Sequence, residues 1–299
     1  MSKVLVTGGA GFIGSNLVDK LISHGHDVVV IDNESAISNS QFYWNPLAEN
    51  HKADVTNYKE IAHLFSGVQY VFHVAAEARL QLSVDNPGLV VNTNTIGTTN
   101  VLEAARAARV KRVIYSMTSS VYGNKNTIPY TETAQADCLN AYAVSKYAGE
   151  LLCKMYSSLH GIETASLRYF NVYGNREPSK GQYAPVVSKF INQHKAGEPL
   201  TIVGDGEQRR DFTNVDDIID ANIAAMQCEQ PLLGEVFNVG AGRNFSINEL
   251  AKLISDKYVY IAERPGEARQ TLADTTKAKT ILGWTPKRRL EDFISESLR

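Results

Sequence analysis

Cysteine is scarce in this chain, with three among its 299 residues. Cys138, Cys153 and Cys228 lie far apart, so their spacing fits neither a disulfide framework nor a C-x-x-C metal or redox motif. We expect all three to be reduced and buried. The seven histidines lack the spacing of a helical zinc site, and His24 and His26 are expected to border a loop after the first helix. The sequence therefore predicts no metal.

The chain also lacks a large excess of charge and any long apolar run. Its formal net charge of -2 gives no electrostatic reason to expect a nucleic-acid partner. The tight basic run at 287–289 is followed at once by acidic residues and is expected on a solvated face. No apolar stretch is long enough to cross a bilayer, and the amino terminus enters a strand without a leader. These features predict a cytoplasmic protein that binds neither nucleic acid nor membrane.

Glycine, in contrast, crowds the first turn of the chain. Gly8, Gly11 and Gly14 lie between a strand-like run and a helical segment. Such a turn lets the backbone approach a diphosphate closely, while the helix amino terminus offers free N–H groups. The pattern alone is weak, because a structural turn can also carry it. Together with the features below it predicts a dinucleotide site, which includes Phe12 and Ile13.

An acidic residue ends the next strand-like run. Asp32 follows the glycines by about 20 residues, where a carboxylate accepts hydrogen bonds from an adenosine ribose. Its charge would repel a 2′-phosphate, which favours NAD over NADP, and Asn33 is a second predicted ribose contact. A turn former at the strand end is the alternative for Asp32, but it does not explain the spacing.

Strand-like apolar runs alternate with helix-length segments in the first half of the chain. This order predicts an α/β fold with a Rossmann-type doubly wound parallel sheet. The expected strands are Val4–Val6, Val28–Ile31, Tyr70–His73, Val113–Ser116 and Thr164–Arg168. Helices are expected over 95–108 and 141–159, and their apolar faces fit a dimer interface or the core equally well.

Glycine and proline interrupt the chain after Arg168. We expect a NAD-binding domain at 1–170 and a smaller, loop-rich α/β domain at 171–299 that binds the substrate. The helical character of 212–225 predicts that the stretch 212–238 returns to pack on the first domain. Functional loops concentrate where a rigid sheet presents them.

Tyr142 and Lys146 lie four residues apart, which makes them neighbours on one helical face. A chain with 14 tyrosines can produce this spacing by accident. A free tyrosine, with a pKa of about 10, is a poor base at neutral pH, so a nearby cation is needed to favour phenolate. Lys146 would supply that charge and hold the nicotinamide ribose. Upstream, the hydroxyl-rich run at 116–120 ends another strand, where ligands of such sheets bind.

In this order, the glycine turn, Asp32, the hydroxyl run and the Tyr142/Lys146 pair resemble the extended short-chain dehydrogenase/reductase family, in its nucleotide-sugar epimerase and dehydratase branch. The resemblance covers nearly the whole chain and implies that Thr118, five residues before Gly123, is the catalytic hydroxyl. It also implies further cofactor contacts, namely Asp54, Val55, Val74, Ala75, Ala76, Asn94 and Phe170.

The second half carries the nucleotide-sugar pattern of the same family, at 168–174, 204–212 and 264–267. The resemblance implies that Asn171, Arg210 and Arg264 bind the substrate diphosphate and that Glu267 belongs to the same site. Thr271 matches the position that limits space beside the sugar 2-substituent, and its small size leaves room for an N-acetyl group. Guanidinium groups suit phosphate oxygens, although surface salt bridges are the alternative for each arginine.

The residues after Thr118 discriminate among the reactions of this branch. Water-eliminating members resemble one another in carrying Asp-Glu directly after the catalytic Thr, and decarboxylating members carry Glu two residues after it. Here Ser119 and Ser120 fill those positions, which favours an oxidise-and-return cycle. The resemblance thus implies NAD-dependent 4-epimerisation of a UDP-hexose, in the glucose or N-acetylglucosamine series. Glu77 and Arg79 are less usual for the UDP-galactose enzymes and leave the sugar open.

Two other interpretations stay open. One is a different nucleotide-sugar enzyme, such as a uronic-acid 4-epimerase or a keto-sugar reductase. The other is a non-catalytic NAD-sensing protein, which the presence of both Tyr142 and Lys146 disfavours. A homodimer through the helices at 95–108 and 141–159 is expected.

Overall fold

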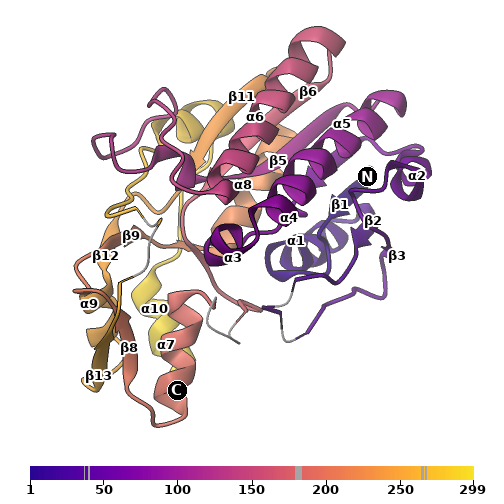
Figure 1. Cartoon of the computed structure of the whole chain (residues 1–299). Helices are drawn as coiled ribbons and strands as arrows, with labels where there is room; N and C mark the ends of the chain where they lie inside the picture. The colour runs from indigo at the N-terminus through magenta and orange to yellow at the C-terminus, as the bar shows by residue number, and fades with distance from the viewer. Residues whose placement is uncertain (37, 40, 179–183, 264–265, 267) are drawn as a thin grey trace.

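The computed structural model describes residues 1–36, 38–39, 41–178, 184–263, 266 and 268–299. Its centre is a seven-stranded sheet in the order β11-β6-β5-β4-β1-β2-β3, and all neighbouring strands are parallel (Figure 1). The strands are β1 (Lys3–Thr7), β2 (Asp27–Asp32), β3 (Glu49–Lys52), β4 (Tyr70–His73), β5 (Arg112–Thr118), β6 (Glu163–Tyr169) and β11 (Leu233–Val239). The strand order reverses between β1 and β4, so the predicted doubly wound sheet is confirmed.

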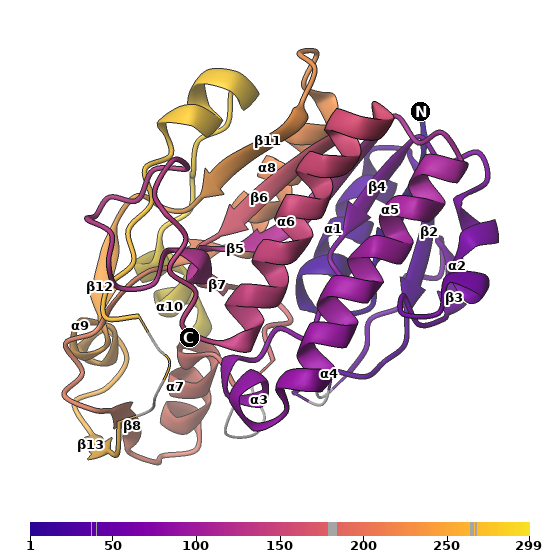
Figure 2. The ribbon, with the colours of Figure 1, turned by 45° about the horizontal axis from the view of Figure 1, so that its top comes forward.

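Helices cover both faces of this sheet (Figure 2). On one face α1 (Phe12–Ser23) packs beside α8 (Val215–Gln227), and on the other α5 (Gly97–Ala107) lies beside α6 (Ala141–His160). Because both faces are covered, the inner strands are largely buried, as in β5, where every residue is buried. Shorter helices at the edge are α2 (Tyr58–Ile61), α3 (Leu80–Asp85) and α4 (Pro87–Val91).

A second group of elements lies beyond the carboxyl ends of the strands. It comprises β7 (Val172–Tyr173), α7 (Val186–Lys195), β8 (Leu200–Val203), β9 (Arg209–Asp211), β10 (Thr213–Asn214), β12 (Asn244–Ser246), α9 (Ile247–Lys252), β13 (Tyr258–Ile261) and α10 (Leu290–Ser297). These elements enclose their own apolar cluster, in which Phe190, Leu200 and Leu250 are fully buried. The cavity described below lies between this group and the sheet.

Several predicted boundaries differ from the structure. The helix expected at 212–225 begins at Val215, because Thr213 and Asn214 pair with β7 and the Asn214 side chain caps the helix by accepting the N–H of Asp216. Helical structure in the 95–108 segment starts earlier, with a π-helical turn over Asn92–Ile96.

A buried ion pair fixes α6 on the sheet. The guanidinium of Arg168 on β6 donates to both carboxylate oxygens of Glu150 on α6, each at 2.9 Å, and to the Tyr122 hydroxyl at 2.8 Å. Both charged side chains are almost fully buried, so removal of Glu150 would leave the charge of Arg168 unpaired in the core. This pair sets the position of α6 and of the residues that it carries.

Two expectations about isolated residues need correction. All three cysteines are free, but only Cys153 is buried, because Cys138 lies in the loop before α6 and Cys228 ends α8. The basic run at 287–289 is not simply solvated, since Arg288 forms ion pairs with Asp216, Asp217 and Asp220. In the described part of the chain, none of the helices combines the length and apolar character of a bilayer span.

Candidate active site

A cavity of about 540 Å³ opens at the carboxyl end of the sheet. Residues at or just beyond five strand ends line it, one each from β1, β2, β4, β5 and β6, namely Gly8, Asp32, Val74, Thr118 and Tyr169. Its opposite wall comes from the second group of elements and includes Asn171, Lys189, Arg210 and Thr271. Doubly wound sheets bind their ligands at this edge, where the strand order reverses.

The glycine turn is packed too tightly for side chains at two of its positions. Gly8 has a φ of +68°, and a Cβ there would lie 2.7 Å from the backbone nitrogen of Ala75. A Cβ on Gly14 would lie 2.1 Å from the carbonyl oxygen of Gly8. Gly11 stands at the N-cap of α1 without a side chain to cap it, so the first N–H groups of the helix are open to an anion. These residues fit the diphosphate of a dinucleotide, and Phe12 and Ile13 line the same cavity.

Asp32 and Asn33 lie at the end of the cavity nearest β2. The Asp32 carboxylate accepts N–H bonds from Ala10 at 3.1 Å and Glu34 at 2.8 Å, and burial raises its pKa. It therefore shapes the turn as well as lining the cavity. Asn33 donates to Asp54 at 2.9 Å, and Val55, not Asp54, lines the cavity.

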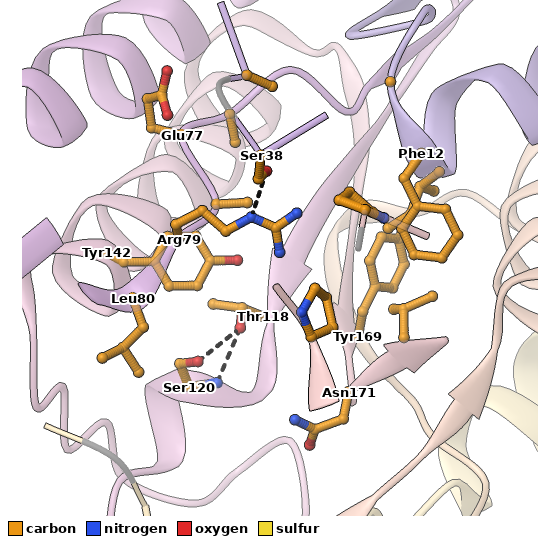
Figure 3. A pocket seen from close by; sticks show the side chains of 18 of the residues that line it. Phe12, Ser38, Glu77, Arg79, Leu80, Thr118, Ser120, Tyr142, Tyr169 and Asn171 are labelled. Carbon is orange, nitrogen blue, oxygen red and sulfur yellow. Dashed lines mark hydrogen bonds between the residues drawn. The ribbon is translucent and has the colours of Figure 1, made fainter. Parts of the chain in front are cut away.

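Tyr142 and Thr118 face each other across the cavity (Figure 3). Tyr142 lies in the first turn of α6, which Asn140 caps by accepting the N–H of Ala143 at 2.9 Å. Thr118 ends β5, and its hydroxyl lies 3.0 Å from the Ser120 hydroxyl. Burial raises the pKa of Tyr142, while the Thr118 hydroxyl and the positive charge of Arg79 lower it.

Lys146 lies one turn further along α6 but does not line the cavity. Its Nζ is 4.2 Å from the centroid of the Tyr115 ring. Burial lowers the pKa of Lys146 to about 7. The structure thus brings Tyr142 and Thr118 together, whereas the ammonium of Lys146 lies over the Tyr115 ring.

Two residues expected beside the cofactor have other positions. Asn94 is buried behind the cavity, where it accepts the N–H of Glu77 at 2.8 Å and donates to Ser145 at 3.0 Å, holding the loop after β4 against α6. Phe170 is fully buried in the core. Tyr169 and Asn171 line the cavity instead of Phe170, because alternate residues of an extended chain point in opposite directions. Val74, Ala75 and Ala76 all line it.

The residues expected to bind substrate form the opposite wall. The Thr271 hydroxyl donates to the Asn171 side chain at 3.2 Å and accepts the backbone N–H of Asp211 at 3.0 Å. Arg210 lines the same part of the cavity. Arg264 and Glu267 lie outside the described residues.

Asp211 holds this wall together, although the sequence analysis did not select it. Its carboxylate accepts backbone N–H bonds from Ala241 at 2.7 Å, Gly242 at 3.1 Å and Ala273 at 3.0 Å. Burial raises the pKa of Asp211 to about 6. One side chain thereby connects three segments around Thr271. The sequence signal that could have identified Asp211 is its position directly after Arg210 in the 204–212 pattern.

Known proteins with the same architecture include sugar-nucleotide enzymes. The NAD dependent epimerase/dehydratase family matches residues 4–240. A putative UDP-glucose 4-epimerase of Methanocaldococcus jannaschii is 38% identical over 97% of this chain and 95% of its own, and a UDP-glucuronate 4-epimerase of Thermodesulfobacterium geofontis is 34% identical over 100% and 95%. The structure of a Thermotoga maritima UDP-glucose 4-epimerase with UDP-glucose superimposes with a TM-score of 0.93 at 37% identity, over 99% of this chain and 97% of that one. The chain therefore belongs to the NAD-dependent epimerase/dehydratase family.

Proposed function

We propose that this chain catalyses the NAD-dependent 4-epimerisation of a UDP-hexose through a transient 4-keto sugar. The observation that carries the proposal is the pair of hydroxyls from Tyr142 and Thr118, which meet in a cavity between the glycine turn and the wall around Thr271. Relatives named as UDP-glucose 4-epimerases over the full length support this reaction. The absence of an acidic residue at Ser119 and Ser120 favours epimerisation over dehydration or decarboxylation.

Tyr142 is the proposed base. Its phenolate takes the proton from the sugar 4-hydroxyl, and the Thr118 hydroxyl holds the same oxygen by a hydrogen bond. When bound, NAD supplies the acceptor and donor of the hydride at C4. Tyr142 then returns the proton after the sugar has presented its other face. We assign two roles to Lys146: its charge favours the Tyr142 phenolate, and its ammonium binds the nicotinamide ribose.

Cofactor and substrate divide the cavity between them. We assign the cofactor to the residues that line the cavity at the strand ends, namely Gly8, Gly11, Phe12, Ile13, Gly14, Asp32, Asn33, Val55, Val74, Ala75 and Ala76. Asp54, Asn94 and Phe170 lie behind this lining and are assigned to its support. Asn171 and Arg210, with Arg264 and Glu267, are assigned to the UDP diphosphate. Thr271 borders the sugar 2-substituent and leaves room for an N-acetyl group. Residues 1–170 then form the NAD-binding domain, to which 212–238 return, and 171–299 the substrate domain.

We further propose a homodimer. Val144, Leu151 and Leu159 on α6 are 51%, 47% and 70% exposed, and their spacing puts them on one helical stripe. The exposed Leu89 and Ile96 continue this apolar surface on the neighbouring helical segment.

Three unpaired cysteines fit a reducing compartment such as the cytoplasm.

The test is product analysis by NMR after incubation with UDP-glucose, UDP-N-acetylglucosamine and UDP-glucuronate, with and without added NADH. We expect the C4 epimer of at least one of these sugars. Tyr142→Phe should lower kcat by a factor of about 100 or more, with NAD content per protomer unchanged. Tyr147→Phe, on the same helix, is the matched control and should stay active. Near-normal turnover by Tyr142→Phe would exclude the proposed base, and a product that forms only with NADH would indicate a keto-sugar reductase.

A further inference from the structure

Arg79 enters the cavity, and the epimerisation described above uses its charge only to lower the pKa of Tyr142, with no contact to the sugar. It follows β4 in the loop that leads into α3, immediately before Leu80. Its Nε donates to the Ser38 hydroxyl at 2.9 Å, and its guanidinium extends over the part of the cavity that holds the Tyr142 hydroxyl (Figure 3). Figure 3 shows the Arg79 guanidinium beside the Tyr142 hydroxyl.

Within the described part of the chain, the positive charge of Arg79 is poorly neutralised. Among the described residues, no carboxylate lies within ion-pair distance of its guanidinium. Glu177 and Glu77 are the acidic groups that interact with it at longer range. Burial raises the pKa of Glu177 to about 8, so this carboxyl carries less negative charge at neutral pH than an exposed glutamate. Burial also raises the pKa of Glu77. A guanidinium stays protonated even where burial lowers its pKa.

The position of the reacting oxygen determines which part of the sugar lies near Arg79. The proposed chemistry holds the 4-oxygen at Tyr142 and Thr118, so the substituents on C3 and C5 lie beside the Tyr142 hydroxyl. Carbon C6, attached to C5, carries a neutral hydroxyl in a hexose and a carboxylate in a hexuronate. A guanidinium binds a carboxylate through two parallel charge-assisted hydrogen bonds, which a single hydroxyl cannot reproduce.

From these observations we propose that Arg79 selects a UDP-hexuronate by binding the sugar carboxylate. This inference rests on the proposed 4-epimerisation and names the substrate class of the same site. A neutral hexose would leave the half-buried Arg79 cation without an anionic partner. Because an unpaired buried charge costs free energy, the site would discriminate against the neutral sugar. The same guanidinium would also suit the diphosphate oxygens of the cofactor. Its hydrogen-bond partner Ser38 lies in the segment after β2, at the end of the cavity that is assigned to the cofactor. The experiment below separates these two sources of oxyanion.

The test compares wild type, Arg79→Gln and Arg79→Lys on UDP-glucuronate, UDP-glucose and UDP-N-acetylglucosamine. We expect wild type to prefer UDP-glucuronate in kcat/KM. Arg79→Gln should lose a factor of about 10 to 100 on that sugar, the range of a charge-assisted hydrogen-bond pair. This loss adds to a smaller fall in kcat that all three sugars share, because the charge of Arg79 also lowers the pKa of Tyr142. Arg79→Lys should keep part of the preference. Arg106→Gln removes an exposed arginine on α5 and is the matched control.

Calorimetry of sugar-nucleotide binding to the NAD-loaded protein, with measurement of NAD content, gives a readout independent of turnover. The expected result is weaker binding of UDP-glucuronate alone in Arg79→Gln, with full NAD content. A wild-type preference for neutral sugars, or an equal loss on all three, would overturn the proposal. Loss of NAD from Arg79→Gln would assign the guanidinium to the cofactor diphosphate instead. If wild type converts none of the three sugars, the proposed epimerisation fails, and the calorimetric comparison still decides whether Arg79 recognises the carboxylate.

Discussion

At the scale of single residues, the active site combines groups that its burial disfavours. Burial raises the pKa of Tyr142 and lowers that of Lys146 to about 7, far from its ordinary value of 10.5. Each shift favours the neutral form, whereas the proposed reaction needs a phenolate and a cation. The Tyr115 ring, 4.2 Å from Nζ, compensates only part of the lost hydration of Lys146. The charged groups that the proposed reaction needs therefore lower the free energy of unfolding of the protein.

We expect Lys146→Met to stabilise the fold while it lowers activity. The folded-state pKa of Lys146 lies below its unfolded value, so its protonated form destabilises the folded protein fully below pH about 7, and this penalty disappears as pH rises toward about 10. Tm should therefore rise by about 2–4 °C at pH 6, for about 1 kcal/mol, and by less at pH 9.

Thermal unfolding of the NAD-free protein at both pH values measures this difference. Lys59→Met, which changes an exposed lysine on α2, serves as the control and should leave Tm nearly unchanged at either pH. An equal gain for Lys146→Met at pH 6 and pH 9 would mean that side-chain packing, not charge burial, is responsible.

At the scale of elements, the Asp211 carboxylate is a shared anchor for several segments of the proposed substrate wall. The loops that contain Ala241, Gly242 and Ala273 have no shared strand pairing, and each donates a backbone N–H to the Asp211 carboxylate. Thr271 lies two residues before Ala273 and donates to Asn171. A buried carboxylate that need not touch the substrate therefore helps to set the geometry of the proposed sugar site.

Asp211→Asn should raise KM for the UDP-sugar by about tenfold, equivalent to about 1.4 kcal/mol, because one amide nitrogen replaces an acceptor and faces a backbone donor. We expect kcat to change by less than about threefold and NAD affinity to be unaffected. Steady-state kinetics and calorimetry with UDP provide the two measurements. Asp205→Asn, at an exposed ion pair with Arg269, is the matched control. A fall in kcat without a change in KM would contradict a positioning role.

The sequence predicts elements well where burial on both faces produces continuous apolar runs. The inner strands β1, β2, β4, β5 and β6 were all located in this way. In contrast, β3 is Glu-Asn-His-Lys at an exposed edge and carries no such signal, and β11 was recognised only as part of the returning stretch 212–238. The first residues of the 212–225 segment were assigned to a helix because apolar spacing cannot reveal that Thr213 and Asn214 pair with β7.

The candidate site was predictable to the extent that its residues lie in local motifs. The glycine turn, Asp32, Thr118 and Tyr142 all line the cavity. The orientation of Lys146 toward Tyr115 depends on packing between α6 and β5, which spacing along one helix does not determine. From the sequence, Arg79 is distinguished only as a residue less usual for the UDP-galactose enzymes. How far its positive charge is neutralised depends on side chains that are distant in the sequence, so the sequence does not reveal it.

At the scale of the whole molecule, the active site exists only where two groups of elements meet. Arg176 forms an ion pair with Asp19 on α1 at 2.7 Å and lies over the Tyr43 ring. Asn16, also on α1, donates to the carbonyl oxygen of Asn175 at 3.0 Å. These contacts connect the segment after β7 to the helix that begins at the glycine turn. The cofactor and substrate walls are thus joined beside the cavity.

The exposed stripe of α6 gives the last prediction, which concerns assembly. If Val144, Leu151 and Leu159 pack against a second copy, a charge at the centre of the stripe must lose its hydration on association, which opposes dimer formation. We expect Leu151→Asp to be monomeric in analytical ultracentrifugation at concentrations where wild type is dimeric. Val259→Lys changes an exposed apolar residue on β13, away from α6, and should remain dimeric. A dimeric Leu151→Asp, or a monomeric wild type, would show that this stripe is not the interface.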